Sequence, residues 1–473
     1  MDSTAPAAPH VGTPAKITPE LLARLDVSGP RYTSYPTADR FVDAFTHDDY
    51  KAALQQCRQH DSDATKPLSV YVHIPFCESL CYYCACNKII TRKRDQGTTY
   101  LDYLRKELTL LVKQIGPDRP VSQLHLGGGT PTFLSNEELA ALMQALRDSF
   151  GFVPEGEYAI EIDPRTVNRQ RLHALWQAGF NRMSLGVQDF DPAVQAAMHR
   201  LQPLAQVREV IEAGRVLGFP SINVDLIYGL PKQTVESFTR TIDQVCQLRP
   251  DRIALYAYAH LPERFMSQRR IAAADLPAPA VKLQLLALSI ERLLAAGYVY
   301  VGMDHFALHD DSLAIAKREG KLHRNFQGYT TQPDCDLVAL GVSGIGRVGN
   351  TYSQNAKTLD DYCQQLDQGK LPVVRGLILN ADDLLRRDVI QAIMCQGHVD
   401  FAAVSAAHKI DFDAYFAAEL AALQPLQAQG LVRAGAGQID VTELGWFFVR
   451  AVAMVFDRYL HTQRSNARFS RII

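Results

Sequence analysis

The sequence predicts an α/β protein: a partial (β/α)6 TIM-like barrel with an N-terminal arm and a mainly helical C-terminal domain. Between residues 69 and 310, short β-type runs alternate with amphipathic helical runs, which implies a parallel sheet with helices outside it. About six such units suit a partial barrel, whose active residues gather at the carboxyl ends of the strands. The pattern differs on both sides of this region. We therefore expect an arm over residues 1–50, the barrel over 51–350 and the C-terminal domain over 351–473.

The N-terminal arm is rich in Pro, Ala and Thr at first and then carries the aromatic segment PRYTSYPTADRF. Its first residues have no basic region and no apolar core, so they do not form a secretory signal. We expect the arm to pack on the barrel rather than to fold as a domain of its own.

Six strand-like runs and one further run define the barrel. They are SVYVHIPF, QLHLGGG, EYAIEID, NRMSLGVQ, SINVDLIYG and DRIALYAYAH, followed by YVYVGMDHF. Helical stretches such as YLDYLRKELTLLVKQI, NEELAALMQALRDSF and LAQVREVIEAGRVLGF lie between them. Ser135 and Glu138 have the spacing of a capping box, which predicts a helix start at the second of these stretches.

The C-terminal domain begins with helical segments, among them DDLLRRDVIQAIM and FDAYFAAELAAL, and continues into a hairpin-like GLVRAGAGQIDVT and a helix-like ELGWFFVRAVAMVFDRYL. Helices followed by a small hairpin suggest a winged-helix arrangement, a shape that many DNA-binding domains share. No strong basic stripe accompanies it, so DNA binding is not favoured. We expect this domain to cover the mouth of the barrel.

The overall composition excludes several classes of protein. The chain has 473 residues, of which 47% are hydrophobic and 21% charged, with a formal net charge of -2. This near-balance gives no reason to expect nucleic acid or an anionic membrane as the main partner. No apolar run approaches the roughly 20 residues that span a bilayer. The sequence therefore predicts a cytoplasmic protein without a membrane span, and a monomer is the simplest expectation.

Four cysteines stand in a ten-residue window of the segment HIPFCESLCYYCACNK, whereas the other five are scattered singly. Cys77, Cys81 and Cys84 form C-x3-C-x2-C directly after the first strand-like run. A structural zinc site needs four ligands and usually a second ligand pair, and no such pair follows. An iron–sulfur cluster held by thiolates therefore fits better, and three protein ligands on a 4Fe–4S cluster would leave one iron open for a substrate or cosubstrate.

The motif CESLCYYC resembles the signature of the radical S-adenosylmethionine (SAM) superfamily, which implies a barrel of the radical SAM type and a cluster on Cys77, Cys81 and Cys84. Over nearly the whole chain, the motifs resemble the oxygen-independent coproporphyrinogen III oxidases. They are RYTSYPTA, YVHIPFC, CYYCACNK, HLGGGTPT, EIDPR, GVQDF, NVDLIYGLPKQT, YAHLP, GMDHFA, HRNFQGYTTQ and FSRII. The resemblance implies that Cys86 is not a ligand but a nearby group that activity requires; a small buried thiol is the alternative.

The same resemblance implies two bound SAM molecules. Contacts to the first match Tyr71, Gly128, Glu161 and Ile345, and contacts to the second match Tyr83, Gly129, Thr130, Gln188, Arg200, Asp225 and Ala259. Read alone, the glycines equally fit a tight turn. Glu161 and Asp225 lie near strand ends, where a carboxylate is costly unless it is used, and a structural salt bridge is the alternative for each. From its local sequence alone, without the resemblance, Arg200 would be interpreted as a solvated cation at a helix end.

The activity that the resemblance implies is the anaerobic oxidative decarboxylation of two propionates of coproporphyrinogen III to vinyl groups, giving protoporphyrinogen IX in haem synthesis. A 5′-deoxyadenosyl radical made from SAM takes a hydrogen from each propionate, and the reaction needs a low-potential electron donor and an electron acceptor. Cationic or amide side chains must hold the other propionates. Candidates are Arg31, Arg264, Arg269, Arg270, His323, Arg324 and Gln327.

Three other readings remain open at this point. A haem chaperone of the same superfamily branch would bind a tetrapyrrole without converting it, but Cys86, PRYTSYPTA and HRNFQGYTTQ favour the oxidase. A different radical SAM enzyme, such as a haem-degrading methyltransferase, would leave the propionates intact. A structural zinc protein would contain zinc without iron or sulfide.

Overall fold

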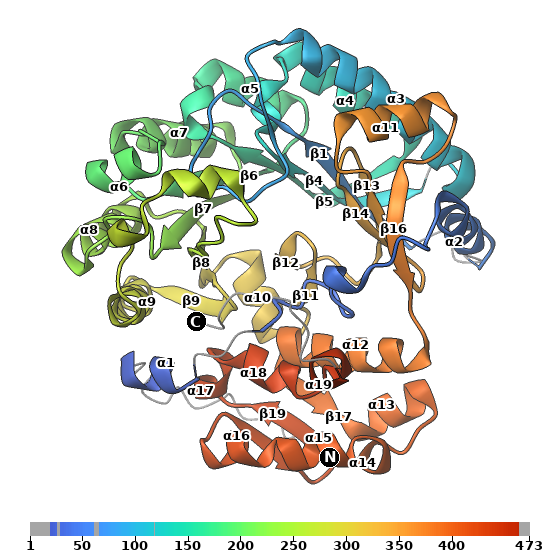
Figure 1. Ribbon diagram of the computed structural model, residues 1–473, viewed down its shortest axis with the longest axis vertical. Coiled ribbons are helices and arrows are strands. Elements are labelled where there is room, and N and C mark those ends of the chain that lie inside the picture. The colour runs from blue at the N-terminus through green and yellow to red at the C-terminus, as the bar shows by residue number, and fades with distance from the viewer. Residues whose placement is uncertain (1–18, 26–28, 61–65, 118, 463–473) are drawn as a thin grey trace, which may run out of the picture.

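The computed structural model describes residues 19–25, 29–60, 66–117 and 119–462 (Figure 1). Within them, one sheet of twelve strands dominates, in the order β16-β15-β14-β13-β1-β4-β5-β6-β7-β8-β10-β9. Six neighbouring strands in its centre are parallel, as the sequence predicts. They are β1 (Leu68–Ile74), β4 (Pro120–Gly128), β5 (Gly151–Ile162), β6 (Arg182–Gln188), β7 (Ser221–Tyr228) and β8 (Arg252–Ala257).

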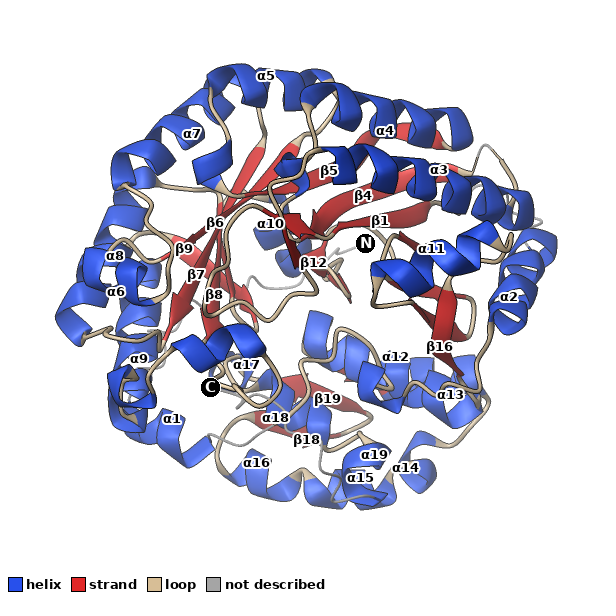
Figure 2. Ribbon diagram, turned by 45° about the horizontal axis from the view of Figure 1, so that its top comes forward, coloured by secondary structure: helices blue, strands red, loops and turns tan. Residues whose placement is uncertain are grey.

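Helices cover the outer face of this sheet, and Figure 2 shows them as a rim around the strands. The helices that follow the central strands are α3 (Asp95–Ile115), α4 (Asn136–Ser149), α5 (Arg169–Gln177), α6 (Pro192–Ala197), α7 (Leu204–Leu217), α8 (Val235–Leu248) and α9 (Pro279–Ala295). The capping box at the start of α4 is confirmed, with Ser135 Oγ accepting from the Glu138 amide and the Glu138 carboxylate accepting from the Ser135 amide. The prediction of an open α/β barrel is therefore confirmed.

Antiparallel strands extend the sheet at both ends. β9 (Tyr298–Gly302) and β10 (His305–Leu308) pair beyond β8, and α10 (Ser312–Arg318) follows them. At the other end, β13 (Asp336–Leu340) is parallel to β1 and leads to β14 (Ile345–Val348), β15 (Thr351–Asn355), α11 (Leu359–Asp367) and β16 (Val373–Ile378). The sheet thus continues past residue 350, the boundary expected from the sequence. The sequence does not indicate this continuation, because β15 and β16 are short strands in which apolar and polar residues alternate only weakly.

Two small two-stranded sheets accompany the twelve-stranded sheet. β2 (Phe76–Cys77) and β3 (Ile89–Ile90) pair with each other directly after β1. β11 (His323–Asn325) and β12 (Gly328–Thr330) form a hairpin whose polar side chains bond to the start of the barrel strands. Gln123 Nε2, for example, donates to Thr330 Oγ1 over 3.0 Å.

The C-terminal region contains helices and a three-stranded sheet (Figure 2). Its helices and strands are α12 (Ala381–Gln396), β17 (His398–Asp400), α13 (Phe401–His408), α14 (Phe412–Tyr415), α15 (Ala417–Ala422), α16 (Gln424–Ala428), β18 (Val432–Gly435), β19 (Gln438–Val441), α17 (Glu443–Trp446), α18 (Val449–Met454) and α19 (Arg458–Thr462). The single helix expected over ELGWFFVRAVAMVFDRYL is wrong, because the segment divides into α17, α18 and α19. Packing causes the break: Phe448 is fully buried, and Trp446 Nε1 donates to Val301 O over 2.7 Å.

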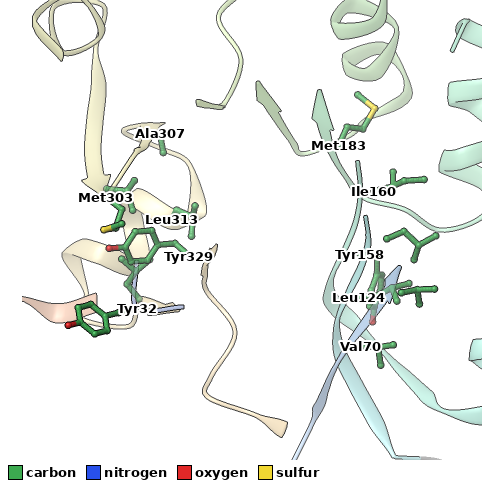
Figure 3. Close-up of a cluster of buried hydrophobic side chains, with 14 of the residues drawn as sticks. Tyr32, Val70, Leu124, Tyr158, Ile160, Met183, Met303, Ala307, Leu313 and Tyr329 are labelled. Atoms are coloured by element: carbon green, nitrogen blue, oxygen red, sulfur yellow. The ribbon is translucent and has the colours of Figure 1, made fainter. Parts of the chain in front are cut away.

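The arm packs between the barrel and the C-terminal region. It contains α1 (Pro19–Leu25), and α2 (His47–His60) follows it on the outside of the sheet. Tyr32 is fully buried and donates to Asp457 Oδ2 over 2.9 Å. Figure 3 shows Tyr32 near Met303 and Tyr329, across from Val70 and Leu124 of the central strands. The arm is therefore part of the core, as expected, while residues 1–18 and the FSRII segment lie outside the described residues.

No helix in the described part of the chain is both long enough and apolar enough to cross a membrane.

Candidate active site

The four clustered cysteines lie on the loop after β1, at the carboxyl ends of the parallel strands, as the barrel prediction requires. Hydrogen bonds from distant segments hold this loop. The Tyr82 amide donates to Met198 O over 3.0 Å, and Ser267 Oγ donates to Cys84 O over 2.8 Å. Gln268 Nε2 donates to Tyr83 O over 3.0 Å. The loop is thus fixed at both flanks by the segments that follow β6 and β8.

All four thiols line one cavity of about 520 Å³, which we call the cysteine cavity. Most of the residues expected to contact SAM line the same cavity. They are Tyr83, Gly128, Gly129, Thr130, Glu161, Gln188, Arg200 and Asp225.

A second cavity of about 740 Å³, which we call the aromatic cavity, adjoins the first, because Cys86, Gly128, Glu161 and Tyr256 line both. Tyr71 and Ile345, expected at the first SAM, line this second cavity. Arg264, Phe265, Phe326 and Gln327 line it as well. Of the expected SAM contacts, Ala259 lines neither cavity; its carbonyl accepts from Gln268 Nε2 over 3.1 Å.

The environments of the thiols differ. Burial raises the pKa of Cys77 to about 11, and its Sγ lies 3.4 Å from Thr130 Oγ1. The hydrogen bond from the Cys86 thiol lowers the pKa of Cys84 to about 6, while that same bond raises the pKa of Cys86 well above its ordinary value. Cys86 is exposed to the cavities, which argues against the alternative that it is a small buried packing residue.

The spacing of the thiols fits a cluster better than a single ion. A zinc ion with Zn–S bonds of about 2.3 Å would bring its thiolates within about 4 Å of one another. Among the described residues, no group of three His, Cys, Asp or Glu side chains is close enough to hold a metal ion. Cys77, Cys81 and Cys84 nevertheless line a common cavity. The donor set is therefore suited to a larger group bound by thiolates, such as an iron–sulfur cluster.

Glu161 at the end of β5 is held in one orientation. Its Oε1 lies 3.0 Å from His125 Nε2, and its Oε2 accepts from the Gly128 amide over 3.1 Å. Burial alone would raise the pKa of Glu161, but the bond to His125 and the Gly128 amide lower it below the ordinary value. His125 in turn stacks on Tyr71 with ring centroids 5.9 Å apart. Glu161 is therefore an ionised acceptor that faces both cavities.

Asp225 on β7 is a different kind of carboxylate. Asn223 Nδ2 donates to its Oδ1 over 2.8 Å, and Ser184 Oγ donates to its Oδ2 over 3.2 Å. Burial, together with the negative charge of Glu161, raises the pKa of Asp225 to about 7. No cationic side chain bonds to it in the described part of the chain, so the salt bridge considered as an alternative is absent there.

The glycine run after β4 is required by close packing inside the protein. Gly128 has a φ of +117°, and a Cβ there would lie 2.6 Å from the His73 ring. A Cβ at Gly129 would lie 2.6 Å from Pro75 O. The run therefore brings the end of β4 against the end of β1, and the Gly128 amide thereby reaches Glu161.

Arg200 is buried rather than solvated, in contrast to its reading from the sequence alone. Its Nη1 donates to Asp163 Oδ2 over 3.1 Å and lies 3.5 Å from Cys81 Sγ. Arg165 also bonds to Asp163 and reaches Cys81 Sγ at 3.8 Å. The sequence reasoning missed Asp163 and Arg165, although the EIDPR motif places Asp163 two residues after Glu161 at the same strand end.

The remaining candidates for substrate contacts lie in different parts of the molecule. Arg269 and Arg270 are exposed on the outer side of the cysteine loop, where Arg269 donates to Pro262 O and Arg270 lies over the Tyr82 ring. His323 and Arg324 line a small third cavity, which shares Phe326 and Leu337 with the aromatic cavity. Arg31 lies over the Tyr256 ring at 5.3 Å, and Arg324 is buried and close enough to lower the pKa of Arg31.

Comparison with known proteins gives the family. A protein-family model described as the radical SAM superfamily matches residues 71–245, and one described as the HemN C-terminal domain matches residues 379–448. Over 456 residues, the chain is 50% identical to the oxygen-independent coproporphyrinogen III oxidase of Pseudomonas aeruginosa, covering 96% of this chain and 98% of the relative. The chain belongs to the oxygen-independent coproporphyrinogen III oxidase family.

Comparisons with the enzyme of Escherichia coli support the same family assignment. The Escherichia coli enzyme of the same name is 46% identical over 453 residues, covering 96% of this chain and 98% of the relative. A solved structure of the Escherichia coli enzyme, described as a radical SAM enzyme, matches with a TM-score of 0.86 and 45% identity, covering 91% of this chain and 97% of that one. The chain is therefore a radical SAM oxidoreductase, and membership implies a 4Fe–4S cluster and SAM. The structural zinc alternative is excluded.

Proposed function

We propose that this protein catalyses the oxygen-independent oxidative decarboxylation of two propionates of coproporphyrinogen III to vinyl groups, giving protoporphyrinogen IX in haem synthesis. The observation that carries the proposal is the convergence of three cluster-type thiols, Cys86 and two strand-end carboxylates on two adjoining cavities. Family membership and the names of the relatives support the choice of substrate.

Cys77, Cys81 and Cys84 would hold the cluster, and the buried guanidinium of Arg200 lies 3.5 Å from Cys81 Sγ. When bound, a reduced 4Fe–4S cluster supplies the electron that cleaves SAM to methionine and a 5′-deoxyadenosyl radical. The protein must then exclude water and competing hydrogen donors from the cavities. A low-potential donor delivers the electron, and an acceptor removes one from the substrate after loss of carbon dioxide.

Glu161 and Asp225 are the residues that we assign to SAM. A carboxylate accepts hydrogen bonds from ribose hydroxyls and from an ammonium group, and its charge suits the sulfonium cation. The two carboxylates face adjoining cavities, with Glu161 on the wall that the cavities share. This arrangement supports the proposal of two SAM molecules side by side, the first toward Tyr71 and Ile345 and the second toward Gln188 and Arg200.

Cys86 lies where the two cavities meet, beside Cys84. We assign it to the reaction rather than to the cluster, because a fourth thiolate on the open iron would block SAM. The remaining space of the aromatic cavity, lined by Phe265, Phe326 and Gln327, is assigned to the tetrapyrrole. We further propose that the protein acts as a monomer in the cytoplasm.

An anaerobic turnover assay tests this function. Reconstituted protein is given SAM, a low-potential reductant, an electron acceptor and coproporphyrinogen III, and the porphyrins are separated after oxidation. Vinyl-bearing products that are lost in Cys77→Ala and Cys86→Ser variants support the proposal. If the wild-type protein cleaves SAM while all four propionates survive, the proposal fails, and a haem chaperone or a methyltransferase takes its place.

A further inference from the structure

A group of three arginines and one histidine lies beside the wall of the aromatic cavity. Its members are Arg31 of the arm, His305 of β10, Arg324 of β11 and Arg450 of α18, and we call them the arginine cluster. These residues act on one another electrostatically: Arg31 and Arg324 both lower the pKa of His305 and of Arg450, although burial is the larger cause for each. Four segments far apart in the sequence therefore converge at one place.

Arg324 has bonding capacity that the protein does not use. Its side chain is buried, with a residue exposure of 5%, and its guanidinium lies over the Tyr329 ring at 4.6 Å. Its Nε and Nη1 have no hydrogen-bond partner in the described part of the chain. His305 Nδ1 is likewise buried without a partner among those residues, and the ring meets Tyr256 and Tyr329 edge to face. Buried donors without partners are costly, so a ligand that accepts from them is expected.

Arg31 and Arg450 are anchored differently. Arg31 pairs with Asp304 and lies over the Tyr256 ring at 5.3 Å. Its side chain is 32% exposed, and burial lowers its pKa. Arg450 donates to the carbonyls of Gly29 and Pro30, which fixes the arm. Burial and the other two arginines lower the pKa of Arg450 to about 9.

The charges of Arg31 and Arg324 do not balance among the described residues. Asp304 pairs with Arg31, whereas no carboxylate of the described chain pairs with Arg324, whose Nε and Nη1 have no partner there. His305 adds no charge near neutral pH, because burial and the neighbouring arginines lower its pKa to about 3. Uncompensated charge inside a protein is expensive unless an opposite charge binds. The cluster is therefore built to receive an anion.

Tyr256 connects this cluster to the candidate active site. Its side chain lines both cavities, while Arg31 lies over its ring and His305 touches its edge. Gln327, three residues after Arg324 on the same hairpin, lines the aromatic cavity, and its side-chain Nε2 and Oε1 are also buried without partners in the described residues. Tyr256 and the hairpin that carries Arg324 and Gln327 therefore place the arginine cluster directly beside the aromatic cavity.

We propose that Arg31, Arg324 and His305 form a buried carboxylate pocket that takes a non-reacting propionate of the substrate. This inference rests on the proposed function, because the reaction leaves two propionates on the product and the pocket can hold one of them throughout. A guanidinium fork binds a carboxylate through two parallel hydrogen bonds. Since empty donors would stay buried and unpaired, the pocket also rejects tetrapyrroles that lack an acid at this position.

The experiment measures binding without turnover. The full chain is titrated with coproporphyrin III and with its tetramethyl ester, which keeps the shape but lacks the charges. We expect Arg324→Met and Arg31→Met to weaken binding of the acid by about 10- to 100-fold and to leave binding of the ester unchanged. Arg240→Met, which removes an exposed arginine from the outer face of α8, is the matched control and should bind both as the wild type does.

Three outcomes decide between the inference and its alternatives. If both variants bind coproporphyrin III as tightly as the wild type, or if their affinities for the acid and for the ester fall equally, the proposed pocket is wrong. If Arg324→Met does not fold, Arg31→Met, at a partly exposed position, carries the same test, and folding is checked by cleavage of SAM with dithionite in the absence of substrate. If the wild type prefers the acid through these arginines but produces no vinyl groups, the pocket stands and the proposed function fails.

Discussion

At the residue scale, Asp225 links the protonation of the site to ligand binding. Its pKa is raised to about 7 by burial and by Glu161, so the carboxylate loses its proton near neutral pH. A cationic ligand favours the ionised form and lowers that pKa on binding. We therefore predict that the affinity for SAM rises between about pH 6 and pH 8 and that Asp225→Asn abolishes this rise. Equilibrium dialysis with SAM at several pH values measures it; an unchanged pH dependence in the variant would contradict the assignment.

His125 gives a second prediction at this scale, because it is a positioning residue for Glu161. His125→Phe keeps a ring against Tyr71 but removes the partner of Glu161 Oε1. We expect reductive cleavage of SAM to fall by about tenfold, with the loss mainly in the KM for SAM, since one charge-assisted hydrogen bond is lost. His125→Gln retains a donor and should recover part of the loss. Equal SAM kinetics in all three proteins would show that Glu161 needs no such support.

The sequence predicts the residues of the site better than their surroundings. The cysteine spacing and the strand-end carboxylates are visible as motifs, so Cys77, Glu161 and Asp225 could be named without coordinates. Asp163 and His125 could not, because each acts through another side chain, and a charged or aromatic residue near a strand end is common. The burial of Arg200 depends on its contact with Asp163, far away in the sequence.

At the scale of secondary-structure elements, Glu107 of α3 joins three segments. Its carboxylate accepts from the Gly341 amide, from Asn355 Nδ2 and from the Tyr362 hydroxyl, so α3 is tied to the β13–β14 and β15–α11 regions. Glu107→Ala leaves these donors buried, and we expect the free energy of unfolding to fall by about 2–4 kcal/mol. Denaturant unfolding of the two proteins at one pH measures the difference; a loss below about 0.5 kcal/mol would contradict this role.

The raised pKa of Glu107 also predicts that the stability of the protein depends on pH. Burial raises the pKa of Glu107 to about 7, above the value of about 4.3 in an unfolded chain. The folded state therefore holds a proton that the unfolded state has lost, so the contribution of Glu107 to stability falls as the pH rises from about 4 to about 7. In Glu107→Gln this part of the pH dependence should be absent, and its persistence would assign the slope to another group.

Predictions for elements succeed where periodicity is local and fail where packing overrides it. The six parallel strands and the Ser135 capping box follow from short patterns in the sequence. The segment over residues 443–460 has an unbroken helical composition, yet Trp446 and Phe448 turn into the core and divide it into three helices. The two strands that extend the sheet to Ile378 pair with neighbours that the sequence alone does not specify.

At the scale of the whole molecule, the arm and the C-terminal helices do more than cover the barrel. The arm carries Arg31 to the wall of the active site, and Arg450 of α18 holds the arm through the Gly29 and Pro30 carbonyls. His305 lies on β10, and Arg324 lies on β11. From the sequence, Arg31 and Arg324 are among seven candidate propionate contacts, but only the complete fold brings them together with His305 and Arg450.

We propose that a radical made from SAM at the cysteine cavity removes hydrogen from the propionates of the substrate. The most direct measurement uses coproporphyrinogen III deuterated at the β-carbons of its propionates, in an anaerobic reaction with SAM and a low-potential reductant. We predict that deuterium appears in 5′-deoxyadenosine together with vinyl-bearing product, and that both vanish in Cys84→Ala. If 5′-deoxyadenosine forms without deuterium while the substrate stays intact, the account of the site is contradicted.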